Sequence, residues 1–328
     1  MIDTIKFKIR TSKEFNEQLK SCAIEWRKFD HKEGSQLMRI YKTNVSLGSY
    51  DKNINIFLSE KDEKHVEIEF SLPKYVYGHN VYLLFQPHIE LYLMEFYKNL
   101  KLYFPAIPHL RYWDITRLDL CYAWKFLDQD TAQAVVDIVK SYSYPRQQKY
   151  IWDSSVMFKG SSYSSKFYLK HPEYYKHDFK NLLFKDIDYA YKIENVSQGV
   201  LRYEITLRKK ALFQNFEKLH VRIDDLTTKN LQSILTYYFN KLFKTSAPKF
   251  MSTTDILKTL QNKFGLVQGK SLYLHYIMMT SEDTESKNAY IRSTKKSTIY
   301  NYNSMLKKAN IGLKKNKNIK LPTEHFNI

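Results

Sequence analysis

The sequence predicts an α+β protein, with a mainly antiparallel sheet that has helices on one face, followed by a helical C-terminal region. Three observations lead to this prediction. Short runs in which apolar and polar residues alternate dominate roughly the first two hundred residues. Few helical patterns interrupt those runs. From about residue 212 onward, apolar residues recur at intervals of three or four, which is the period of an amphipathic helix.

The runs predicted to be strands share β-branched or alternating apolar residues. They span residues 2–9, 36–45, 53–59, 65–72, 113–124, 154–160, 164–170 and 200–209. Helices are predicted between them at 87–100 and 128–142, the second opened by Asp or Thr caps. Pro172 is predicted to begin a long polar helix or loop that reaches residue 195.

The end of the chain is predicted to be helical at 227–243, 253–264 and 294–312. The segment "KTSAPK" at 244–249 is predicted to be a linker, and "KKNKNIK" at 314–320 is a basic tail. We therefore expect two domains, residues 1–215 and residues 216–328.

The composition excludes some classes of protein. The chain of 328 residues has 43% apolar residues, a mean hydropathy of −0.52 and no run of about 18 apolar residues, so a membrane protein is not expected. The first residues lack the apolar core of a signal peptide. Cys22 and Cys121 form no CxxC pair, which makes disulfides or a zinc cluster unexpected. These features predict a cytoplasmic protein.

The charge indicates a polyanionic partner. The chain has 52 Lys and Arg residues against 34 Asp and Glu residues, a net charge of +18. Such an excess is typical of proteins that bind nucleic acid. The alternative is a basic proteome encoded by an AT-rich genome, because Lys, Asn, Ile and Tyr are all abundant here.

Four of the predicted strands carry charged residues on one face and apolar residues on the other. The charged-face residues are Glu67 and Glu69, then Arg117 and Asp119, then Lys166, Tyr168 and Lys170, and finally Arg202 and Glu204. If these strands are neighbours, the acids would repel one another unless a hard cation, Mg²⁺ or Mn²⁺, lay among them. The alternative is a solvated sheet face, whose charges serve only solubility.

Tyr168 lies between Lys166 and Lys170 on its polar face. A phenol titrates near pH 10, so the two ammonium groups and a bound cation are expected to lower its pKa and to favour attack on a phosphodiester. An ordinary solvated strand has the same pattern, and the residues around Tyr168 alone do not choose between the two interpretations.

The chain resembles the gene II/X replication initiators of filamentous phages and their plasmid relatives. The similar stretches lie within residues 1–215 and are "MIDTIKFKI", "VEIEFSLPKYVYGHNVYLL", "ITRLDLCYAW", "WDSSVMFKGSSYSSKFYLKH" and "LRYEITLRKKAL". This resemblance implies a rolling-circle endonuclease of a phage or plasmid, which nicks and rejoins DNA through a 5′-phosphotyrosine intermediate. It makes residues 1–215 the catalytic domain and residues 216–328 the DNA-binding region.

The resemblance implies that Tyr168 is the nucleophile, with Lys170 beside it. The family has a lysine where Glu69 stands, so Glu67 is the acid that carries over. No histidine forms the His-x-His pair of the wider rolling-circle class, so carboxylates are expected to supply the metal ligands: Glu67, Asp119 and Glu204. Arg117, Lys166 and Arg202 are expected to contact DNA. His79, in "GHNV", is a secondary candidate for a metal or phosphate contact.

The last predicted helix is expected to read duplex DNA in the manner of a helix-turn-helix, with Lys295 and Lys296 near its start. A packed helix of a bundle has the same pattern. The expected partner is origin DNA, single-stranded at the nick and duplex where it is recognised. Host helicase and polymerase are further candidate partners, in the cytoplasm of a bacterial host. The alternatives are a non-catalytic DNA- or RNA-binding regulator, in which Tyr168 stacks on a base, and a hydrolytic nuclease.

Overall fold

A computed structural model describes residues 1–21, 25–29, 38–46, 53–59, 62–144, 146–246, 253–281, 283–309 and 311. These residues divide into two compact units, and the division falls between Leu242 and Phe243. Cys22 and the basic tail at 314–320 lie outside the described residues, as does most of the predicted linker beyond Ser246.

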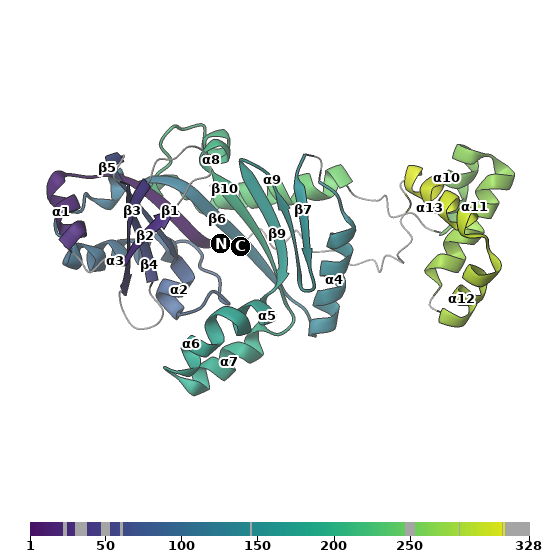
Figure 1. Ribbon diagram of the computed structural model, residues 1–328, viewed down its shortest axis with the longest axis horizontal. Coiled ribbons are helices and arrows are strands. Elements are labelled where there is room, and N and C mark those ends of the chain that lie inside the picture. Colours follow the sequence, from purple (N-terminus) through teal and green to yellow (C-terminus); the bar gives the residue numbers. More distant parts are fainter. Residues whose placement is uncertain are drawn as a thin grey trace. The chain divides into compact units, whose positions relative to one another are not determined.

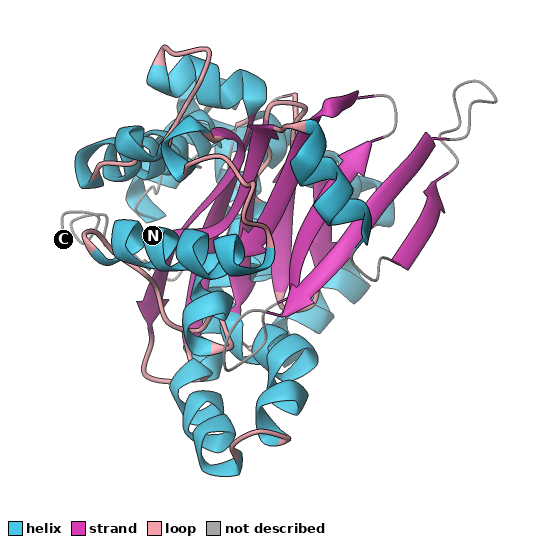
Figure 2. Cartoon of the chain, turned by 90° about the vertical axis from the view of Figure 1, so that its left-hand side faces the viewer, coloured by secondary structure: helices cyan, strands magenta, loops and turns pink. Residues whose placement is uncertain are grey.

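The first unit is built on one antiparallel sheet, whose strands lie side by side with a marked twist (Figure 2). Its strand order is β2-β3-β4-β5-β1-β6-β10-β9-β8-β7. The strands are β1 (Ile2–Arg10), β2 (Glu25–Phe29), β3 (Met38–Ser46), β4 (Asn53–Ser59), β5 (Asp62–Ser71), β6 (Asp114–Lys125), β7 (Gln148–Trp152), β8 (Ser155–Lys159), β9 (Tyr163–Leu169) and β10 (Val200–Arg208). The antiparallel sheet of the predicted fold class is therefore confirmed.

Helices cover the apolar face of this sheet. On α3 (His88–Tyr103), Phe96 stacks on Phe70 with ring centroids 3.9 Å apart. On α9 (Thr228–Ser246), Phe239 packs against Trp124 and Tyr203. α4 (Gln129–Ser141) buries an apolar stripe and begins after Asp128, whose carboxylate accepts a hydrogen bond from the Thr131 N–H. The predicted alternation is thereby explained, since one face of β1, β4, β5, β6, β8, β9 and β10 supplies the core.

The remaining helices of the first unit are short. They are α1 (Lys13–Ser21), α2 (Leu72–Tyr77), α5 (Lys170–Tyr174), α6 (Lys180–Leu183), α7 (Ile187–Ser197) and α8 (Lys209–Phe216). Figure 1 shows α5, α6 and α7 grouped at one end of the strands. α1, α2, α8, β2 and β7 are not among the predicted elements. β7 escapes prediction because it is a mostly exposed edge strand without alternating burial, and α2 because it has six residues and carries Pro73 in its first turn.

The second unit is helical, with α10 (Thr253–Phe264), α11 (Leu266–Thr280), α12 (Thr284–Ser293) and α13 (Lys296–Lys308). Ile256, Leu260, Leu272 and Leu306 form its core. The buried His275 ties three helices together, because its ring nitrogens lie 2.8 Å from Tyr290 Oη and 2.8 Å from Asn303 Oδ1. A helical C-terminal region, the second part of the predicted fold class, is thereby confirmed.

The division between the units differs from the predicted boundary at residue 215. α9 belongs with the sheet as far as Leu242, because its apolar side fills the core over Trp124 and Tyr203. Among the described helices, none combines the length and the apolar composition of a transmembrane segment.

Candidate active site

The polar face of the sheet bears a cavity of about 380 Å³. Its lining includes Asp3, Glu69, Lys74, Asn80, Arg117, Asp119, Lys166, Tyr168, Glu173 and Glu204. These residues come from segments far apart in the sequence: most lie on strands of the sheet, whereas Lys74 lies on α2, Asn80 in the 78–81 segment and Glu173 on α5. The structure thus brings together six of the residues singled out by alternation, namely Glu69, Arg117, Asp119, Lys166, Tyr168 and Glu204, while their chemical roles remain predictions.

The strand pairing explains why these side chains meet. β10 lies between β6 and β9, and Glu204 is paired with Cys121 on one side and with Lys166 on the other. Tyr168 is paired with Arg202. Because alternate residues of paired strands point to the same face, Lys166, Tyr168 and Glu204 share the polar face.

Tyr168 is enclosed rather than open to solvent. Its side chain is 4% exposed, and its hydroxyl donates a hydrogen bond to Glu204 Oε2 over 3.1 Å. The Lys166 ammonium lies 4.3 Å from the centre of its ring. Burial and the Glu204 carboxylate raise the pKa of Tyr168 well above 10. Burial and Glu204 thus oppose the lowering of this pKa that was expected from Lys166, Lys170 and a bound cation, and that lowering stays a prediction.

Two carboxylates of the cavity, Glu204 and Asp119, hold their protons more firmly than isolated ones. Burial and the nearby Asp3 and Asp119 carboxylates raise the pKa of Glu204 to about 7. Burial also raises the pKa of Asp119, against the opposing effect of Arg117. Arg117 donates to Asp119 Oδ1 over 2.9 Å and to Asp119 Oδ2 over 2.6 Å. Glu204 therefore changes charge near neutral pH while it accepts the hydrogen bond of Tyr168.

These pKa values predict how stability varies with pH. Between pH 4.5 and about 7 the folded protein holds the Glu204 proton and the unfolded chain does not, so this group makes the free energy of unfolding fall as pH rises. Glu204→Gln is expected to reduce that fall by roughly 1–3 kcal/mol. In Glu204→Gln the free energy of unfolding should still fall somewhat as pH rises, because the pKa of Asp119 is raised as well.

Urea unfolding at several pH values, without divalent cations, measures this effect. Glu67→Gln is the matched control, because Glu67 is 40% exposed and does not line the cavity. In Glu67→Gln the free energy of unfolding should fall with rising pH as much as it does in the unmodified protein. An identical pH dependence in Glu204→Gln and in the unmodified protein would contradict the raised pKa.

The cavity contains the type of ligand atom that a hard cation prefers, but its side chains are not spaced to hold one ion. Asp3, Asp119 and Glu204 present carboxylate oxygens, the ligands that Mg²⁺ and Mn²⁺ prefer. Within the described ranges, however, no three acidic, His or Cys side chains lie close enough together to share one ion. Asp119 is held by Arg117 instead.

Glu67, one of the acids expected to bind metal, lies outside this cavity. It forms an ion pair with Lys6 over 2.6 Å. Glu69, on the same strand, does line the cavity, and its Oε1 lies 3.1 Å from Arg117. Alternation placed both Glu67 and Glu69 on the polar face. It could not show which of them lines the cavity, because the cavity occupies only part of that face.

Lys170 and Arg202 are buried rather than available to DNA. Both are 0% exposed. Lys170 begins α5 instead of ending the strand, and it pairs with Glu173 and with Asn80. Arg202 donates to the Val81 carbonyl over 3.1 Å. Arg202 is therefore wrong as a DNA contact. Lys170 does lie beside Tyr168, with its ammonium 5.9 Å from the ring centre, but it is covered, because the 78–81 segment and α5 lie over this end of the sheet.

His79 is a structural residue. It is 0% exposed, its Nε2 lies 3.0 Å from Tyr189 Oη, and its Nδ1 accepts from the Val81 N–H. Burial, Lys170 and Arg202 lower its pKa to about 3, so the ring is neutral. Neither the metal contact nor the phosphate contact considered for it fits this environment.

Asp3 is one of two acids of the cavity that alternation did not identify, and the other is Glu173 of α5. Simple alternation along β1 places it on the same face as Ile5 and Phe7, which are buried in the core. The pairing of β1 with β6 shifts by one residue between Ile2 and Ile5, and Asp3 instead accepts hydrogen bonds from Asn80 and Ser71. The available signal was that Asp3 is the one acidic residue of β1.

Lys295 and Lys296 lie in the second unit at the start of α13. Both are exposed, and Lys295 is the residue that precedes the helix. The opposite side of α13 packs through Leu306 into the helical core. The helix is therefore a packed bundle helix whose N-terminal end presents two cations.

The family model that describes the N-terminal part of the phage gene II replication-associated protein matches residues 1–253. No curated protein and no solved structure matches the chain significantly. The matched segment contains the entire sheet and every residue of the cavity. The chain therefore belongs to the family of phage replication-associated proteins typified by the filamentous-phage gene II product.

Proposed function

We propose that this protein initiates rolling-circle replication by nicking and rejoining origin DNA, with Tyr168 as the nucleophile, in the cytoplasm of a bacterial host. The observation that supports this most is the 3.1 Å hydrogen bond from Tyr168 to Glu204, inside a cavity that also holds Arg117 and Lys166. A carboxylate whose pKa is about 7 accepts a proton at neutral pH far better than an ordinary one.

In the proposed reaction, the Tyr168 proton passes to Glu204. The phenolate oxygen then forms a bond to the phosphorus, and the bond between that phosphorus and the 3′-oxygen breaks. The 3′-oxygen takes a proton, for which protonated Glu204 is a source, and leaves as a 3′-OH. The 5′-phosphate stays on Tyr168, so a later 3′-OH can reverse the step and reseal the strand.

Arg117 and Lys166 are proposed to hold the phosphate over Tyr168, because both line the cavity and Lys166 lies against the ring of Tyr168. Asp119 and Glu204, with Asp3 and Glu69 beside them, are the proposed oxygen ligands for Mg²⁺ or Mn²⁺. A bound cation would polarise the scissile phosphate and offset the negative charge that builds up on it.

A covalent adduct tests this proposal. The protein is mixed with Mn²⁺ and single-stranded oligonucleotides that tile the replicon carrying its gene, each labelled at its 3′ end. One oligonucleotide should give a labelled protein band that survives denaturing electrophoresis. A hydrolytic nuclease would cut the DNA without a labelled protein band, and a regulator would leave it intact.

A non-catalytic DNA- or RNA-binding regulator is the second candidate function. It is favoured by the burial of Tyr168, whose raised pKa makes the resting phenol a poor nucleophile. In that case Tyr168 would serve only the packing of the cavity. Cleavage of no oligonucleotide, together with tight binding of one of them, would support this function instead.

The second unit is proposed to bind duplex origin DNA through the start of α13. Lys295→Ala with Lys296→Ala is expected to weaken duplex binding and to reduce the slope of log K against log salt by up to about two phosphate contacts. Nicking of a single-stranded oligonucleotide should be unchanged, since the cavity lies in the first unit.

Fluorescence anisotropy at several salt concentrations measures that slope. The matched control is Lys307→Ala with Lys308→Ala, at the other end of α13, where both side chains are also exposed. An equal reduction of the slope in the two double variants would contradict a specific role for the N-terminal end of the helix.

A further inference from the structure

A second cavity lies on the other face of the sheet, among β9, α8 and α9. Its volume is about 590 Å³, within the range of about 300–1,000 Å³ that small-molecule sites occupy. Tyr163 of β9, Asn215 of α8 and Asn230, Tyr237, Tyr238 and Lys241 of α9 contribute to its lining. Tyr163 and Tyr168 belong to one strand and, five residues apart, point to opposite faces.

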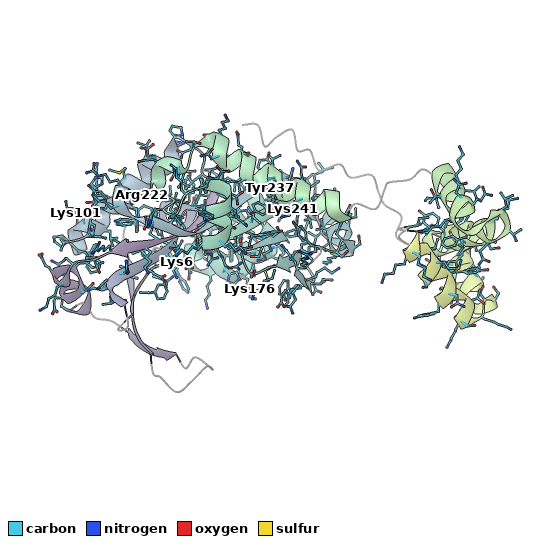
Figure 3. The ribbon with its side chains drawn as sticks, turned by 90° about the horizontal axis from the view of Figure 1, so that it is seen from above. Lys6, Lys101, Lys176, Arg222, Tyr237 and Lys241 are labelled. Carbon is cyan, nitrogen blue, oxygen red and sulfur yellow. The ribbon has the colours of Figure 1, made fainter. Side chains whose placement is uncertain are left out.

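The aromatic rings of this cavity form a continuous cluster. The ring centroids of Tyr163 and Tyr238 are 4.6 Å apart, and those of Tyr237 and Tyr238 are 5.0 Å apart. The Lys241 ammonium lies 5.2 Å from the centre of the Tyr163 ring and 5.4 Å from that of Tyr237. Figure 3 labels Tyr237 and Lys241, one helical turn apart on α9.

Packing does not account for Tyr237. It is 54% exposed, whereas Tyr238 is 3% exposed and offers no such open surface. Three amide side chains, of Gln214, Asn215 and Asn230, line the cavity beside the rings, and the amide nitrogen of Asn215 donates to Tyr238 Oη over 2.9 Å. An exposed ring, amides and one ammonium group are the set that binds an unpaired nucleotide: the ring stacks on the base, amides pair with its edge and the cation meets its phosphate.

We propose that this second cavity binds an unstacked base of single-stranded DNA, with Tyr237 as the stacking surface, Asn215 and Asn230 at the base edge and Lys241 near the phosphate. This site is separate from the cavity that contains Tyr168, since the sheet lies between the two. It requires single-stranded DNA as a ligand but does not require the nicking reaction. It would hold a strand that has already been displaced.

The test uses the full chain with Tyr168→Phe, so that no cleavage occurs and the outcome does not depend on the proposed chemistry. The probes are fluorescein-labelled oligothymidylate and an oligonucleotide of equal length with abasic sites. Adding Tyr237→Ala is expected to weaken binding of oligothymidylate by about tenfold. It should leave binding of the abasic probe unchanged, because the phosphates remain.

Two further variants make the result specific. Tyr237→Phe keeps the ring and should retain the affinity for oligothymidylate. Tyr103→Ala removes a tyrosine that is 56% exposed at the end of α3, outside the cavity, and should have no effect. The proposal is overturned if Tyr237→Ala binds oligothymidylate as tightly as its parent. Equal losses for both probes would also overturn it, since the ring would then not recognise a base.

Discussion

Tyr168→Phe is expected to reduce the rate of covalent adduct formation by at least about a thousandfold, because it removes the only oxygen that attacks phosphorus in the proposed reaction. The affinity for the oligonucleotide should hardly change, since the ring and its contact with Lys166 remain. Single-turnover assays with the 3′-labelled oligonucleotide, followed by denaturing electrophoresis, measure the rate.

Tyr175→Phe is the matched control for this change. Tyr175 lies near Tyr168 in the sequence but is 57% exposed and does not line the cavity, so its variant should form the adduct at the unmodified rate. Tyr174 is a less suitable control because its hydroxyl donates a buried hydrogen bond to the Ala190 carbonyl. Persistence of the adduct in Tyr168→Phe would show that another tyrosine is the nucleophile.

Asp119→Asn and Glu204→Gln are expected to abolish cleavage supported by Mg²⁺ or Mn²⁺, because in each case the proposed cation site loses a charged oxygen ligand. In Glu204→Gln the acceptor for the Tyr168 proton is lost as well. Binding of single-stranded DNA should be unchanged or tighter, since a negative charge leaves a surface that faces phosphate.

Binding of Mn²⁺ in the absence of DNA, followed by electron paramagnetic resonance, separates the two roles. Both variants should bind Mn²⁺ at least about tenfold more weakly if Asp119 and Glu204 are ligands. Glu67→Gln is the control, because Glu67 pairs with Lys6 outside the cavity. If Glu204→Gln loses cleavage but keeps Mn²⁺ affinity, Glu204 acts only on the proton. Undiminished metal-dependent cleavage in both cavity variants would rule out this site.

The sequence alone determined which residues share a face. Alternation placed Ile68 and Leu118 in the core, and both are 0% exposed. The same period placed Asp119, Tyr168 and Glu204 on the polar face, where they line one cavity. This inference succeeds because a strand has a period of two wherever its pairing is regular.

Only the tertiary structure decided which polar residues are accessible and which of them meet. Asp3 reaches the cavity through a shift in strand pairing that alternation does not show. Lys170 and Arg202 are 0% exposed because α5 and the 78–81 segment lie over one end of the polar face. The period of a strand is local, whereas register, neighbouring strands and covering segments depend on contacts between residues far apart in the chain. That is why the sequence predicted the polar face but not the hydrogen bond between Tyr168 and Glu204.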